Sequence, residues 1–151
     1  MNAVFVKVSL VCTLFFGALS AFAPANTNNL VQEVLAETNA FRKNNGLGAL
    51  EIREELNVIA VQHSQNMAKG IVTFGHAGFE KRNVIAFKTL SGLKSFAENV
   101  AAGQATGKEA VGKWQLSAGH RQNLLGKYRF TGIGIAKDKD GRLYYTQVFG
   151  G

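Results

Sequence analysis

Cysteine is almost absent from this chain of 151 residues, which contains only Cys12. Cys12 lies in an apolar run near the N-terminus and lacks the small-residue context expected of a lipoprotein cysteine. If that run is removed during export, the mature chain contains no thiol. Such a chain forms no disulfide bond, offers no thiolate ligand to a metal ion and has no cysteine nucleophile.

Charged residues are also scarce at the start of the chain, where Lys7 is the only one in residues 1–25. A mostly apolar run from Val8 to Ala18 leads into Ala21-Phe22-Ala23, a pattern typical of signal-peptide cleavage sites. We therefore expect residues 1–25 to be a signal peptide and residues 26–151 to form one secreted or periplasmic domain. An uncleaved anchor is the alternative, but the run is short for a membrane span.

Acidic residues are outnumbered, because 10 Asp and Glu stand against 17 Lys and Arg, which gives a formal net charge of +7. The densest basic group contains Lys81, Arg82, Lys88 and Lys94. A solvated basic face is the ordinary interpretation of such a group. An exported protein rarely meets nucleic acid, so we expect no nucleic-acid partner. The functional alternative is peripheral contact with an anionic membrane or a cell-wall polymer.

The rest of the chain has the length of one domain, without internal repeats, and predicts helices first and strands last. Apolar residues at helical spacing, bounded by capping and glycine signals, predict four helices. Two runs rich in Ile, Val, Thr and Tyr flank a glycine-containing turn and predict a hairpin. The expected helices cover residues 28–44 (capped by Asn28 or Asn29), 54–69, 80–90 and 108–116, and the expected strands cover residues 130–137 and 142–149.

Two segments carry titratable side chains in sequence that favours turns, namely Phe96–Gly103 with Glu98 and Ser117–Leu125 with His120. His76 and His120 each follow a glycine, and Glu98 lies 22 residues from both. Two imidazoles and a carboxylate are the ligand set of open zinc sites. No His-Glu-x-x-His run is present. Two interpretations therefore stay open: a weak divalent-metal site, with zinc as an example, and a hydrogen-bonded cluster in which Glu98 orients a histidine. We favour the cluster.

Ser117, His120 and Glu98 also suggest a hydrolytic triad. The chain has no Gly-x-Ser-x-Gly elbow that would expose a serine hydroxyl beside oxyanion donors, so we expect Ser117 to end a helix instead. His63 falls on an apolar helix stripe and is expected to be packed, with one partner for its ring. Trp114 is expected in the core.

Three further polar residues have two interpretations each. Arg82 and Arg121 are expected to form ion pairs or to bind carbonyl groups, and an arginine beside a cleft could instead hold an anionic ligand. Gln147, on the last expected strand, either donates hydrogen bonds into the cleft or is an ordinary outward amide.

Short motifs follow one another along residues 29–150 in a characteristic order. They are Asn39, Arg42, Gly46-Leu47, His63-Ser64, Met67-Ala68, Phe74-Gly75-His76, Ala97–Gly103, Trp114, Ser117–Leu125, Gly132-Ile133-Gly134 and Tyr145–Gly150. This order resembles that of bacterial secreted SCP-domain proteins, which belong to the CAP superfamily, named for cysteine-rich secretory, antigen 5 and pathogenesis-related 1 proteins. The resemblance implies an α+β fold, a three-layer α-β-α sandwich with helices on both faces of a small sheet.

The family also carries a cleft tetrad of two histidines and two glutamates, and His76 and Glu98 resemble its first histidine and first glutamate. The chain departs at the other two positions, where Ser117 and Tyr144 stand. His120 matches a Ser-x-Gly-His-Arg segment that bacterial members carry instead. The resemblance implies a non-enzymatic binding or interaction module for a lipid, a small hydrophobic molecule or an envelope polymer. A metal-assisted hydrolase of peptide or cell-wall bonds is the alternative.

Overall fold

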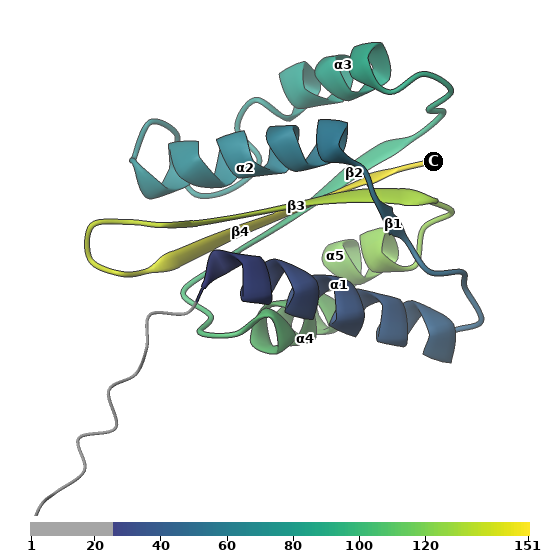
Figure 1. Cartoon of the computed structure of the whole chain (residues 1–151), viewed down its shortest axis with the longest axis horizontal. Coiled ribbons are helices and arrows are strands. Elements are labelled where there is room, and N and C mark those ends of the chain that lie inside the picture. Colours follow the sequence, from purple (N-terminus) through teal and green to yellow (C-terminus); the bar gives the residue numbers. More distant parts are fainter. Residues whose placement is uncertain (1–25) are drawn as a thin grey trace, which may run out of the picture.

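The structure is a computed structural model that describes residues 26–151, so the expected signal peptide lies outside the described residues. The described chain contains helices and strands in mixed order (Figure 1). Among them, no helix combines the length and the apolar composition needed to cross a membrane. The elements are α1 (Thr27–Asn44), β1 (Glu51–Ile52), α2 (Glu54–Ala68), α3 (Phe79–Thr89), β2 (Phe96–Ala102), α4 (Gly107–Leu116), α5 (Ala118–Leu124), β3 (Phe130–Lys137) and β4 (Leu143–Gly150).

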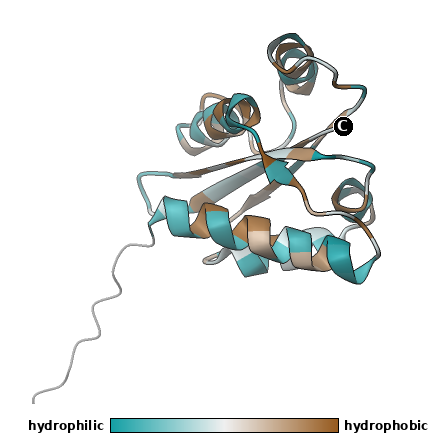
Figure 2. Ribbon diagram, turned by 45° about the vertical axis from the view of Figure 1, so that its right-hand side comes forward, coloured by the Kyte–Doolittle hydropathy of each residue, from teal (hydrophilic) through white to brown (hydrophobic). Residues whose placement is uncertain are grey.

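One four-stranded sheet separates two layers of helices, as Figure 1 shows. The strand order is β1-β3-β4-β2, in which β1 pairs parallel with β3 and the other neighbours pair antiparallel. Apolar side chains of α1, α4 and α5 pack on one face of the sheet, and those of α2 and α3 pack on the other. Brown, apolar segments accordingly occur on the helices of both layers in Figure 2. The expected α-β-α sandwich is confirmed.

The expected helices and the hairpin are present, with small shifts at their ends. The cap of α1 is Asn26, whose side chain accepts a hydrogen bond from the Asn28 amide at 3.1 Å, so the expected cap at Asn28 or Asn29 is wrong by two or three residues. Ser117 ends α4 as expected. Trp114 is buried and donates from Nε1 to the Val100 carbonyl at 2.9 Å, which confirms its core position.

Both segments expected to form turns are regular elements instead. The first contains β2, which pairs with β4 from Phe96 to Ala102. Residues 97–101 are all buried, so β2 is covered on both faces and lacks the alternation of a half-exposed strand. The second contains α5, which follows α4 directly and is held by packing of Leu124 rather than by length or propensity.

Two sets of close contacts hold α2 and α5, which carry candidate site residues, against the rest of the fold. A Cβ built on Gly134 would lie 2.2 Å from the Ala60 carbonyl carbon, so the backbones of β3 and α2 approach as only glycine allows. On the other layer, Arg42 of α1 is 2 % exposed and binds four backbone carbonyls. Its guanidinium donates to the carbonyls of Gly48, Leu124, Gly126 and Tyr128 at 2.9–3.1 Å, which fixes the loop that follows α5.

Candidate functional site

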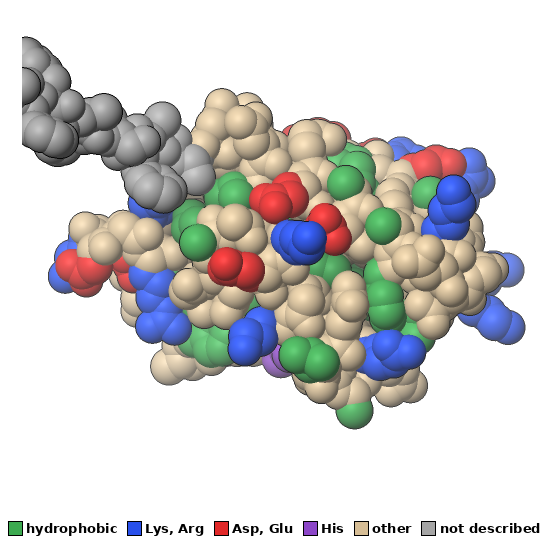
Figure 3. Space-filling model, turned by 90° about the horizontal axis from the view of Figure 1, so that it is seen from below, with side chains coloured by type: hydrophobic (Ala, Val, Ile, Leu, Met, Phe, Trp, Pro, Cys, Tyr) green, Lys and Arg blue, Asp and Glu red, His purple; other side chains and the backbone are tan. Residues whose placement is uncertain are grey.

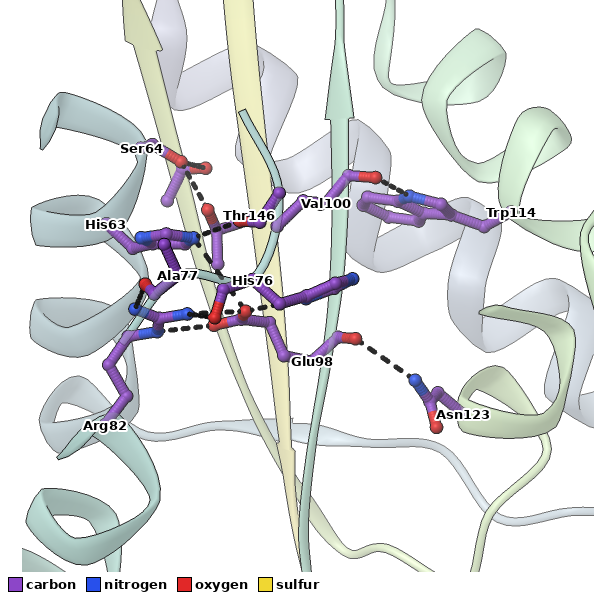
Figure 4. A network of polar contacts seen from close by, with 12 residues as sticks. His63, Ser64, His76, Ala77, Arg82, Glu98, Val100, Trp114, Asn123 and Thr146 are labelled. Atoms are coloured by element: carbon purple, nitrogen blue, oxygen red, sulfur yellow. Dashed lines mark hydrogen bonds and ion pairs between the residues drawn. The ribbon is translucent and has the colours of Figure 1, made fainter. Parts of the chain in front are cut away.

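Glu98 is the centre of a polar network on the face of β2 that α2 and α3 cover (Figure 4). Its side chain is fully buried, and both of its carboxylate oxygens accept hydrogen bonds. Arg82 of α3 donates from Nε to Oε2 at 2.6 Å and from Nη2 to Oε1 at 2.7 Å. His76 donates from Nδ1 to Oε1 at 2.9 Å. A buried carboxylate held by a bidentate arginine is fully paired, as burial of a charge requires.

Arg82 also ties the loop between α2 and α3 to the sheet. Its Nη1 donates to the Ala77 carbonyl at 2.8 Å, while the other guanidinium nitrogens hold Glu98. Gly75 in the same loop has φ +136°, a conformation that L side chains rarely adopt. This conformation precedes His76 and directs the loop across β2. Of the two interpretations of Arg82, the structure therefore supports the structural ion pair.

His63 of α2 lies beneath this loop and is 2 % exposed, which confirms that it is packed. Its Nε2 donates to the Gly75 carbonyl at 2.8 Å and lies 3.8 Å from Glu98 Oε1. Burial lowers the pKa of His63, and the attraction of Glu98 only partly opposes that shift. His63 is thus a neutral ring that supports the loop from below. The sequence pattern did not reveal its proximity to Glu98.

The second sequence-predicted histidine approaches the network from the opposite layer. The rings of His76 and His120 have centroids 6.1 Å apart and are tilted by 46°. The His120 carbonyl accepts a hydrogen bond from the Asn99 side chain at 3.1 Å, which attaches α5 to β2. Burial lowers the pKa of His120, and the neighbouring His76 lowers it further. His76 thus lies between Glu98, which it contacts directly, and His120.

The structure places the other three sequence-predicted residues away from this network. Gln147 is fully buried beneath α1, where it bonds Thr38 at 3.2 Å and Thr131 at 3.3 Å. Alternation along β4 puts it on the opposite face of the sheet from Glu98, so both interpretations of Gln147 are wrong. Arg121 is exposed and lies over the Phe41 ring at 5.1 Å. Ser117 joins α4 to α5, and its hydroxyl makes no capping bond.

A cleft of about 470 Å³ opens beside His76 and Glu98. Asn123 of α5 helps to close it, because its amide donates to the Glu98 carbonyl at 3.1 Å and to Asn99 Oδ1 at 2.9 Å. Three of the lining side chains are aromatic and come from separate parts of the chain, so no local motif revealed them. The lining residues are His76, Phe79, Phe96, Ala97, Glu98, Asn123 and Tyr128.

The arrangement at Glu98 does not fit a bound metal ion. Among residues 26–151, no three His, Cys, Asp or Glu side chains are grouped so that they could hold one. Both carboxylate oxygens of Glu98 accept hydrogen bonds from Arg82, and the positive charge of Arg82 would repel a cation at the same place. The pair of His76 and Glu98 has a different chemical capability. The Glu98 carboxylate fixes the Nδ1–H tautomer of His76, and the His76 side chain remains 47 % exposed.

Comparisons with known proteins agree with this fold. The profile of the cysteine-rich secretory protein family, CAP, matches residues 35–149. The uncharacterized protein YkwD of Bacillus subtilis is 34% identical over 130 residues, which are 85% of this chain and 50% of YkwD. The uncharacterized membrane protein YlbC of the same organism is 32% identical over 121 residues, which are 78% of this chain and 33% of YlbC. This chain thus spans half or less of the length of these two relatives.

Solved structures give the same result. An extracellular protein containing a SCP domain from Bacillus anthracis superposes with a TM-score of 0.68 at 28% identity, covering 81% of this chain and 40% of that one. An outer surface protein from Borrelia burgdorferi superposes with a TM-score of 0.69 at 20% identity, covering 83% and 94%. The second likeness is one of fold alone. With the family profile covering most of its length, this chain belongs to the cysteine-rich secretory protein (CAP) family.

Proposed function

We propose that the cleft beside His76 binds a small molecule with an apolar body and one polar group, and that it does so without catalysis. The observation that carries the proposal is the saturation of Glu98, whose carboxylate is held by Arg82 and His76. A carboxylate whose two oxygens both accept from these donors orients a histidine and is a poor ligand for a metal ion. Glu98 is therefore a positioning residue for His76.

The two parts of the cleft lining suit the two parts of such a ligand. Phe79, Phe96 and Tyr128 offer aromatic area to the apolar body. His76 presents Nε2, which accepts a hydrogen bond from a ligand hydroxyl or, once protonated, pairs with a ligand acid group. This chemistry fits a lipid or another small hydrophobic molecule better than a wholly polar envelope polymer.

The alternative function is metal-assisted hydrolysis of peptide or cell-wall bonds. It requires Glu98 to release Arg82 before a metal ion could be bound, which would leave a buried guanidinium without its carboxylate. A serine mechanism requires Ser117 to reach the cleft, and Ser117 is not among the residues that line it. The observed contacts therefore favour binding over either hydrolytic route.

We test the proposal by NMR titration of residues 26–151 with octanoic acid and with octanol. Saturable shifts are expected for the His76 ring and the Asn123 side-chain amide. His76→Gln should weaken binding about five-fold, because one hydrogen bond contributes about 1 kcal/mol. Phe74→Ala is the matched control, since Phe74 is 54 % exposed and does not line the cleft. Shifts confined to other parts of the molecule would refute the site.

Ser117→Ala separates binding from hydrolysis. We expect this variant to bind the octanoate probe as the parent protein does, whereas Glu98→Gln should weaken binding because His76 loses the carboxylate that orients it. A catalytic serine behaves differently, since its loss lowers the rate by several orders of magnitude. Hydrolysis of envelope peptides that disappears in a correctly folded Ser117→Ala protein would establish the alternative function.

We infer that the protein acts outside the cytoplasm. The support is the signal-peptide pattern of residues 1–25, together with similarity to an extracellular protein that contains a SCP domain. Mass spectrometry of the protein from its native host should find an N-terminus at Pro24 or Asn26. Recovery of the full-length chain in the cytoplasm would contradict this inference.

A further inference from the structure

Exposed apolar side chains are concentrated on one layer of the molecule. The described residues include seven large apolar side chains that are exposed, and six of them lie on α2, on α3 or in the loop between these helices. The seventh is Leu116 of α4, on the other layer. An apolar groove of about 410 Å³ between α2 and α3 joins Val58 to Ile85. The six residues are Val58, Ile71, Phe74, Val84, Ile85 and Phe87.

Positive charge is concentrated on the same part of the chain. Residues 69–95 contain five basic residues and one acidic residue, Glu80, so they carry more than half of the formal net charge of +7. Arg82 is neutralised by Glu98. Lys81, Lys88 and Lys94 have no ion-pair partner within residues 26–151. The opposite layer differs, because acidic and basic side chains are interspersed over the face shown in Figure 3.

The two properties coincide along one exposed stripe of α3, which borders the groove between α2 and α3. Lys81, Val84, Ile85 and Lys88 follow the spacing i, i+3, i+4, i+7, which places them on one stripe of the helix. Ala86 is fully buried on the side that faces the core. The stripe thus has two exposed aliphatic side chains between two lysines, on a helix at the periphery of the molecule (Figures 1 and 2).

We propose that this stripe, together with Phe87 and the exposed Ile71 and Phe74, docks the protein on a membrane that contains anionic lipids. Lysines attract anionic head groups, while aliphatic and aromatic side chains enter the boundary between head groups and acyl chains. A hydrophilic polyanion would pair with the lysines but would leave the exposed apolar side chains without a partner. A second copy of the chain would bring the same positive charges into contact. The inference does not rest on the function proposed for the cleft.

Flotation of residues 26–151 with lipid vesicles tests the inference. We expect binding to vesicles of phosphatidylcholine mixed with phosphatidylglycerol, little binding to pure phosphatidylcholine, and weakening as salt rises. The double variant Lys81→Gln, Lys88→Gln should lower the partition coefficient about thirty-fold, since each lysine near an anionic surface contributes about a five-fold increase. The matched control is Lys127→Gln, Lys137→Gln, which removes two lysines outside residues 69–95 and should bind as the parent protein does.

The apolar part is tested by Val84→Ser with Phe87→Ser, which should lower binding about ten-fold. Leu116→Ser is the control, because Leu116 is 84 % exposed on the other layer. The inference is overturned if Leu116→Ser and the double serine variant lose binding equally, or if the parent protein binds acidic wall polymer but no vesicle. It is also overturned if ultracentrifugation shows a dimer that Phe87→Ser dissociates. Octanoate titration of the same variants should be unchanged, which keeps this test separate from that of the cleft.

Discussion

Substitution of Glu98 by glutamine tests the central observation about the site. The variant keeps the shape of the side chain but removes the negative charge that faces Arg82. The Glu98 side chain is fully buried and that of Arg82 is 12 % exposed, so the guanidinium loses its charged partner in a place that water barely reaches. Breaking one side of a buried ion pair costs about 3–5 kcal/mol. That loss lowers the melting temperature by roughly 10–20 °C for a domain of this size.

The assay is urea-induced unfolding followed by circular dichroism, with Glu55→Gln as the matched control. Glu55 pairs with Arg53 at 3.0 Å, but both side chains are more than one third exposed and water screens the pair, so its loss should destabilise the protein far less than the loss of Glu98. A double variant with Glu98→Leu and Arg82→Met replaces both charges by apolar groups and should be more stable than Glu98→Gln. The reasoning is refuted if Glu98→Gln costs no more than Glu55→Gln.

Three other predictions concern packing and protonation. Gly134→Ala should destabilise the fold by about 3 kcal/mol or more in urea unfolding, because its Cβ would lie 2.2 Å from the α2 backbone. Gly112→Ala, which meets nothing within 4 Å, should stabilise it by about 0.5–1 kcal/mol, and equal effects would contradict the close contact. Burial lowers the pKa of His63, so the unfolded state binds more protons. The free energy of unfolding should therefore fall as pH drops through about 6.5, and less steeply in His63→Gln. Burial raises the pKa of Tyr145 to about 12, so stability should fall above about pH 10, and an ultraviolet titration should find one tyrosine ionising that late.

Much of the fold follows from local sequence. Apolar spacing and glycine stops predicted the helices near their observed positions, because a helix that covers a sheet buries one stripe and leaves the other exposed. The hairpin around Gly141 followed from turn chemistry between two runs of strand-forming residues. The burial of His63 and Trp114 followed from their positions among apolar neighbours.

Tertiary structure alone decided the composition of the site. β2 escaped prediction because it is covered on both faces, so Ala97, Glu98 and Asn99 are all buried and show no alternation. Its place at the edge of the sheet beside β4 brings α3, the loop before it and α5 to one strand. That placement pairs Glu98 with Arg82, positions His76 near His120 and sets Gln147 on the far face. Local periodicity reports only which side of an element is buried, whereas the partners of a buried charge depend on the order of strands and on which helix crosses them.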